Sequence, residues 1–361
     1  MNRSNTPLYD GKDHNLKPEP YCFACRHYGN RIVVASLQRC SRCQVAWYCS
    51  SECQKKHFQL HRKLCKRIED ERNRVDTEAI PLRTFVDPWQ DNAVAENIFE
   101  TRIGEFGELD ETEKYLKACA KLAKSYWMAA YDCEVKEVWE KALFHYLELL
   151  RLDEMNGFNT KFRVPFILLY LNRDDDAYAF IRYCLQYDDL DPDEILVKHK
   201  HSREGDWIYD VEENCRYRDI FEECPNIDDV DLPGPHIVAL AIIKLRIFEA
   251  HYAVSRTLDF VFKKSNGKRI QEVRPLVQDM LLDRNVDIDD QQDVLDSLLE
   301  RIPPFMFEAI SKLKGVCESK CALEMEELTR RFEFPVNVTL FSGARLFCRV
   351  PGVDEVIRSW R

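Results

Sequence analysis

The feature that most constrains this chain is a dense run of metal-type ligands near its N-terminus. Eight such side chains lie within 44 residues, spaced as C-x2-C, 14 residues, C-x2-C, five residues, C-x3-C, seven residues and H-x3-C. They are Cys22, Cys25, Cys40, Cys43, Cys49, Cys53, His61 and Cys65. Eight ligands complete two tetrahedral zinc sites, and a closed shell of four ligands leaves no position for a substrate. The sequence therefore predicts two structural zinc ions per chain.

The spacing within the run has a local reason. A C-x2-C pair forms a tight knuckle that aims two thiolates at one ion. Cys49 and Cys53, like His61 and Cys65, are four residues apart, which places each pair on one face of a helix. Residues 54–66 contain no Gly or Pro and suit a short helix. A segment with so few core residues should fold only with its metal.

Disulfides are the competing interpretation of these thiols. The chain has 15 Cys, an odd number, and its first 20 residues are polar, without the apolar run of a secretion signal. Disulfides persist in oxidising compartments. We therefore favour zinc and expect an intracellular protein, cytoplasmic or nuclear and not secreted.

Residues 48–65, YCSSECQKKHFQLHRKLC, resemble the second half of a MYND finger. The family pattern is C-x2-C, C-x2-C, Y-C-x3-C-Q and H-x3-C, and residues 22–65 fill every metal position. The resemblance implies a cross-brace, in which one zinc takes Cys22, Cys25, Cys49 and Cys53 and the other takes Cys40, Cys43, His61 and Cys65. His57 also stands four residues from Cys53 and competes with His61, but the family ligand stands at His61.

The resemblance also implies a function. MYND fingers are protein-binding modules that take short Pro-containing peptides, and Gln54 and Phe58 match positions that face the family's peptide groove. These two residues are four apart, so one helix face can present both. Family members usually carry Trp where this chain has Phe58, and packing beneath the zinc knuckles is the alternative role of this side chain. We expect an adaptor or scaffold that binds protein partners.

Some proteins with this finger are lysine methyltransferases, whose catalytic domain is split around it. Here only 21 mostly polar residues precede Cys22, and the sequence contains no Asn-His-x-Cys and no Gly-Glu-Glu-x4-Tyr motif. Motifs for phosphate loops, serine hydrolases and zinc proteases are also missing from the sequence. We therefore predict that the protein is not an enzyme, with a methyltransferase relative as a less favoured interpretation.

Charge separates the finger from the rest of the chain. The net charge is −11, yet residues 22–67 hold ten Lys or Arg and one acid. A basic finger makes a nucleic-acid-associated regulator the alternative function, but a pI of about 5.5 makes nucleic acid an unfavoured partner. No apolar stretch is long enough to cross a bilayer, so we expect no membrane partner.

The remaining sequence predicts a mainly α fold, with the small two-zinc cross-brace finger followed by an α-helical, solenoid-like body. Trp139, Ala142, Leu143 and Tyr146, followed by Ala177 and Phe180, resemble a tetratricopeptide-type helical pair. We predict a disordered arm at 1–21, the finger at 22–65, a Pro-containing linker at 66–91, a tetratricopeptide-like region at 92–187, an acidic loop-rich segment at 188–235, a helical region at 236–331 that includes a helix at 271–281, and a C-terminal tail at 332–361 with an extended segment at 336–341.

Overall fold

The computed structural model describes residues 9–353, except 32, 90, 154–157, 188–189, 202–208, 226–231, 265–272 and 274–285, together with Val356. The finger contains α1 (Phe23–His27), β1 (Gln38–Arg39), β2 (Trp47–Tyr48) and the first turns of α2 (Ser51–Leu82). β1 and β2 pair antiparallel, with Gln38 opposite Tyr48. Apart from Val273, the expected helix at 271–281 lies outside the described residues.

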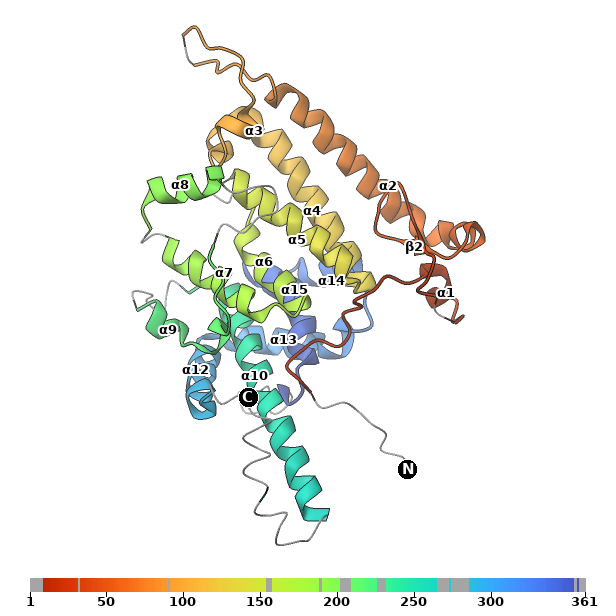
Figure 1. Cartoon of the computed structure of the whole chain (residues 1–361), viewed down its shortest axis with the longest axis vertical. Coiled ribbons are helices and arrows are strands. Elements are labelled where there is room, and N and C mark those ends of the chain that lie inside the picture. Colours follow the sequence, from red (N-terminus) through yellow and green to blue (C-terminus); the bar gives the residue numbers. More distant parts are fainter. Residues whose placement is uncertain are drawn as a thin grey trace.

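The body is built from helices, which confirms the predicted mainly α class (Figure 1). Short 3-10 helices are interspersed at Phe106–Glu108, Asp110–Thr112, Thr160–Phe162 and Cys215–Tyr217. The α-helices are α3 (Ile98–Thr101), α4 (Glu113–Cys133), α5 (Lys136–Leu152), α6 (Val164–Tyr170), α7 (Asp174–Gln186), α8 (Pro192–His201), α9 (Ile220–Glu223), α10 (Gly234–Lys264), α12 (Ile288–Arg301), α13 (Pro304–Cys317), α14 (Ala322–Thr329) and α15 (Val336–Arg349).

Helix α2 connects the finger to the body as one continuous rod. Its N-terminus is capped by the Ser50 side chain, which accepts a hydrogen bond from the backbone N–H of Cys53 at 3.2 Å. The helix then runs along α4 as far as Leu82. The sequence predicted a linker from residue 66, but burial of Ile68 and Leu82 against the body keeps the chain helical. Pro81 falls in the last turn of α2, so it does not interrupt the earlier turns.

Aromatic side chains fill the centre of the body. Trp127 on α4 lies 4.2 Å from the ring of Phe341 on α15, and Trp139 on α5 stacks on Tyr170 of α6 at 4.3 Å. Both tryptophans are buried. The C-terminal helix α15 therefore packs into the same core as the first helices of the body, although more than 180 residues separate them in the sequence.

The segment 336–341 is part of helix α15, not the extended segment that we predicted. Alternating Val and Thr residues favour a strand by propensity, but the helix buries one continuous stretch against α6, α10 and α13. Gly343 permits the close approach to α6, because a Cβ there would lie 2.6 Å from Cε1 of Phe166. Much of the expected C-terminal tail is thus core.

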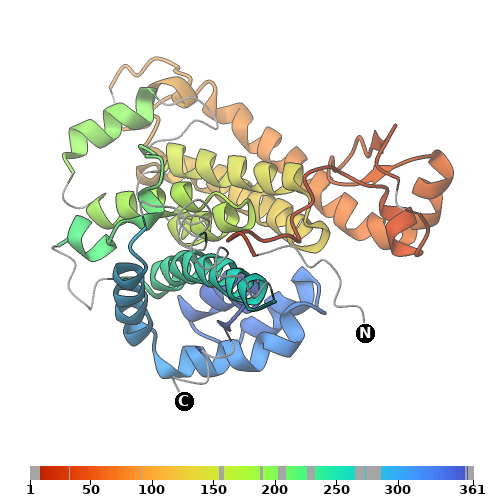
Figure 2. The same cartoon turned by 60° about the horizontal axis from the view of Figure 1, so that its bottom comes forward.

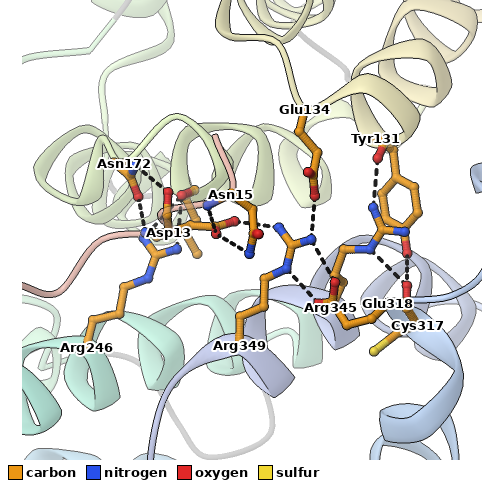
Figure 3. Close-up of polar contacts among 11 residues, drawn as sticks. Asp13, Asn15, Tyr131, Glu134, Asn172, Arg246, Cys317, Glu318, Arg345 and Arg349 are labelled. Atoms are coloured by element: carbon orange, nitrogen blue, oxygen red, sulfur yellow. Dashed lines mark hydrogen bonds and ion pairs between the residues drawn. The ribbon is translucent and has the colours of Figure 1, made fainter. Parts of the chain in front are cut away.

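Residues 9–21 form a strap across the body, where the sequence predicted a disordered arm (Figure 3). The backbone N–H of Asp13 donates to Oδ1 of Asn172 at 2.7 Å, and its carboxylate pairs with Arg349 at 2.7 Å. Lys17 then makes backbone hydrogen bonds with Glu134 and Lys136 of 2.7 and 2.9 Å. These long-range partners, which sequence patterns do not display, hold the strap in place.

The acidic segment is more helical than we predicted, since it contains α8 and α9. Several of its acids are paired: Arg182 binds Glu223 at 2.7 Å and Glu212 at 2.9 Å. The buried Lys244 links α10 to this segment, because its Nζ donates hydrogen bonds to the backbone carbonyls of Arg216 and Arg218. These ion pairs neutralise acidic side chains that, from the sequence alone, we expected to lie in a solvated loop.

Candidate metal centre

The first ligand set joins the start of α1 to the start of α2. Cys22 and Cys25 flank the first turn of α1, and Cys49 and Cys53 flank the N-terminus of α2. The Sγ atom of Cys25 lies 3.8 Å from that of Cys49 and 3.9 Å from that of Cys53, and Cys49 and Cys53 are 3.5 Å apart. Four sulfurs at about 2.3 Å around a tetrahedral zinc are separated by about 3.8 Å. The spacing of these sulfurs therefore fits one shared ion.

The second set joins the turn between β1 and β2 to the next turns of α2. Sγ of Cys40 lies 3.7 Å from Sγ of Cys65, and Sγ of Cys43 lies 3.4 Å from Nε2 of His61. All four ligands are buried, and the ligand atoms of each set lie within 4.8 Å of one another. The protein thus has two zinc sites, one formed by four cysteines and the other by three cysteines and a histidine, which confirms the predicted cofactor content.

The protonation of the thiols shows why the metal is needed. Burial, reinforced by the neighbouring thiols Cys22 and Cys49, raises the pKa of Cys25 to about 12. Four thiols this close cannot all ionise on their own. A divalent cation reverses that preference, because zinc binds the thiolate form. The thiolate ligands of each site are therefore stable together only when an ion is bound.

His57, the competing ligand, lies outside both sets. Its Nδ1 is 3.1 Å from the hydroxyl of Tyr48, and its ring stacks at 6.2 Å on that of His61. Tyr48 and His57 thus flank the ligand His61, a supporting contact that our reading of the sequence missed. Tyr48 stands directly before Cys49 in the motif, and this tyrosine was the sequence signal that could have indicated the contact.

The two residues predicted to bind peptide are exposed. Gln54 lies on the first turn of α2, and Phe58 lies one turn later with 48% of its surface exposed. Phe58 therefore does not pack beneath the zinc knuckles. Beside it Lys55 and Arg62 are exposed as well, so the outer surface of α2 combines an aromatic ring with two cations.

The finger makes direct contact with the body. The hydroxyl of Tyr21 donates to the backbone carbonyl of Cys133 at 2.9 Å. The guanidinium of Arg72 on α2 donates to the backbone carbonyl of Arg42 at 3.0 Å. This hydrogen bond connects α2 to the turn that carries the zinc ligands Cys40 and Cys43. A cavity of about 750 Å³ opens between Leu60 on the finger side and the body. Figure 2 shows the finger extending from one end of the α2–α4 pair.

Comparison with known proteins identifies the finger. The family model of the MYND finger matches residues 22–65, so the resemblance is confirmed over that segment. Histone-lysine N-methyltransferase ASHR1 of Arabidopsis thaliana is 40% identical over 72 residues, covering 19% of this chain and 14% of the relative. Histone-lysine N-methyltransferase SMYD3 of Homo sapiens is 34% identical over 89 residues, covering 22% of this chain and 20% of the relative. No solved structure matches the chain.

The relatives correct one prediction. We predicted that the protein is not an enzyme, and this is overturned by matches to two proteins that are named histone-lysine methyltransferases. The chain spans a fifth or less of the length of each of these relatives, so the correction reopens the question of activity without assigning one. Among the described residues, no helix is long and apolar enough to span a membrane.

Proposed function

We propose that this protein binds partner proteins through its MYND finger, with Gln54 and Phe58 contacting short peptide segments, and that the helical body holds the finger in a fixed orientation as part of an adaptor. The observation that carries the proposal is the exposure of Phe58, 48%, on a helix whose inner face supplies His61 and Cys65 to zinc. A large aromatic side chain on a rigid support loses little conformational freedom on binding.

The charge around Phe58 narrows the kind of partner. Lys55 and Arg62 flank the ring on the exposed side of α2, at i−3 and i+4. A peptide that combines apolar and acidic side chains would bury the ring and meet both cations. A Pro-containing peptide of that composition is therefore the expected ligand class.

The proposal is tested with the zinc-loaded, full-length protein and a fluorescent library of Pro-containing peptides, half of them acidic. We expect acidic members to bind and Phe58→Ala to weaken binding about 30-fold, the equivalent of about 2 kcal/mol for loss of an aromatic anchor. Phe305→Ala is the matched control, because Phe305 is 54% exposed on α13, far from the finger in sequence. A Phe58→Ala protein that retains zinc and full affinity would refute the role of this residue.

Methyl transfer is a second candidate function, favoured by the names of the two relatives. Both zinc sites have closed shells of four ligands, so the finger itself provides no position for such chemistry. An assay for transfer of a labelled methyl group to histones by the full chain tests this candidate. Incorporation that persists in Phe58→Ala would separate catalysis from peptide binding by the finger.

A further inference from the structure

The loop between α2 and α3 exposes an unusual amount of apolar surface. We call residues 84–97, residue 90 aside, the docking loop. Within it Trp89 is 92% exposed, Val94 is 83% exposed and Val86 is 52% exposed, and Ile80 on the adjoining turn of α2 is 67% exposed. Tryptophan is the side chain most enriched among residues that dominate binding energy at interfaces. The exposed indole of Trp89 is apolar surface that binding to a partner would remove from water.

The docking loop is held at its base. Phe85 is buried and exchanges two backbone hydrogen bonds with Glu96, of 2.9 and 2.8 Å. Arg102 pairs with both Asp87 and Glu96 at 3.2 Å, and Asp87 accepts a hydrogen bond from the backbone N–H of Trp89 at 2.9 Å. A loop anchored in this way loses less conformational entropy when its tip binds.

The charge of the docking loop is opposite to that of the finger. Its ionisable residues are Asp87, Asp91 and Glu96, and it has no Lys or Arg. Arg102 neutralises part of this charge by pairing with Asp87 and Glu96, whereas Asp91 has no ion pair among the described residues, so the loop remains net acidic. The exposed side of α2 in the finger presents Lys55, Phe58 and Arg62, and neither of these cations has an ion pair within the part of the chain that the structure describes. We call these three residues the finger face. An acidic loop with an exposed indole and a basic face with an exposed phenyl ring are complementary in both charge and apolar surface.

The two surfaces of one chain cannot meet. Phe58 and Leu82 are 24 residues apart on the same helix, a rise of about 36 Å. Figure 1 shows the docking loop at one end of α2 and the finger at the other. The docking loop can therefore reach a finger face only on a second molecule.

We propose that the docking loop of one copy of this chain binds the finger face of a second copy, with Trp89 packed against Phe58. The contact is head-to-tail, because different surfaces of the two molecules meet, and each dimer retains one free loop and one free finger face. The inference rests on the proposed function, since it names the ligand of the same finger surface.

Sedimentation velocity of the zinc-loaded, full-length protein over a range of concentrations tests the proposal. We expect the unmodified chain to associate beyond a dimer, and we expect the association to weaken as salt is added. Trp89→Ala and Phe58→Ala should each be monomeric at concentrations where the unmodified chain associates. Phe305→Ala removes an equally exposed aromatic ring elsewhere and should associate like the unmodified chain.

Mixing the two monomeric variants gives the decisive measurement. The Trp89→Ala chain keeps its finger face and the Phe58→Ala chain keeps its docking loop, so an equimolar mixture should form dimers that grow no further. A mixture that remains monomeric overturns the proposal, as does association that survives Phe58→Ala or an unmodified chain that is monomeric throughout.

The two levels of inference fail in different ways. The acidic peptides of the library are titrated into the same preparations. If library peptides bind in a Phe58-dependent manner while the unmodified chain is monomeric, the self-association is wrong and the proposed function stands. If no library peptide binds and the chain is monomeric, both are wrong.

Discussion

The finger and the body are stabilised in opposite ways. In the finger, residues 22–65 converge on two ion sites, and the eight ligands are close in sequence. In the body, Trp127 packs against Phe341 and Trp139 against Tyr170, and the partners come from helices far apart in sequence. A metal site can be specified by spacing alone, because each ligand has a fixed chemistry. A packed core is specified by shape, which depends on residues that no local pattern connects.

The two regions nevertheless share one structure. Helix α2 supplies ligands to both zinc sites and then packs along α4, and one continuous buried core includes Trp47 of the finger and Trp127 of the body. Tyr21 adds a hydrogen bond from the finger side to the end of α4. Because α2 belongs to both regions, loss of metal from the finger should also lower the stability of the body.

Removal of zinc should have the largest effect. Structural zinc contributes roughly 10 kcal/mol or more to the folding of small metal-dependent units, so a chelator should unfold residues 22–65. Because α2 belongs to both regions, we also expect hydrogen-exchange protection of α4 to fall, although not to zero. Cys53→Ala should lose an ion, whereas Cys321→Ser, an exposed cysteine outside the finger, should retain both. Unchanged protection of α4 after chelation would show that the finger unfolds separately.

Core truncation should affect the body and spare the metal. Trp127→Ala removes a buried ring that also stacks on Tyr131 at 5.3 Å, and we expect a loss of about 3–5 kcal/mol in the free energy of unfolding. The exposed Trp89 provides a matched control, because Trp89→Ala should change stability by less than about 0.5 kcal/mol. Denaturant titration gives both values, and elemental analysis should find two zinc ions in each variant. Zinc loss from Trp127→Ala would mean that the body also shapes the finger.

The strap should make stability depend on acidity. Burial alone would raise the pKa of Asp13, but Arg349 and the backbone N–H of Asn15 outweigh burial and hold this pKa below its ordinary value. The stabilisation is therefore present above about pH 4 and is lost as the pH falls through the lowered pKa. Asp13→Asn should cost about 2 kcal/mol at neutral pH and little in strong acid.

A matched surface variant controls for general charge effects on that profile. Glu113→Gln breaks the exposed pair with Lys117, which should be worth less than about 1 kcal/mol at any pH. If the free energy of unfolding depends on pH in the same way for Asp13→Asn and the unmodified chain, the Asp13 carboxylate of the strap does not stabilise the body.

The sequence predicted the finger far better than the boundaries of the body. Cys22 and Cys65 belong to a pattern whose spacing along the chain determines how the ligands are arranged around zinc. The mainly α class was predicted from the periodicity of apolar residues. The order of the strap depends on Asn172 and Arg349, which lie far along the chain from Asp13. Helix α15 depends on its packing against α6 and α10, where Gly343 permits a close approach. Such contacts become visible only when the chain is folded.

The assignment of the domains stays a prediction, because no measurement yet divides the chain. The long α2 shows why boundaries are hard to predict from composition. Pro81 and Pro88 suggested a linker, but Pro81 is the penultimate residue of α2, so the hydrogen bond that it cannot donate ends the helix and does not divide it. Burial of Ile68 and Leu82 then decides the local structure.

The smallest expected effect is the most informative about the finger. Phe58 belongs to the region that depends on metal, yet its ring is 48% exposed and lies outside both ligand shells. Phe58→Ala should therefore retain two zinc ions and lose less than about 1 kcal/mol in the free energy of unfolding, a loss typical of surface positions. Elemental analysis and denaturant titration of the same preparation measure both quantities. A loss of about 3–5 kcal/mol would instead be the cost of removing a buried aromatic ring. That result would place Phe58 in the folded core of the finger and would remove the exposed ring on which binding by this surface depends.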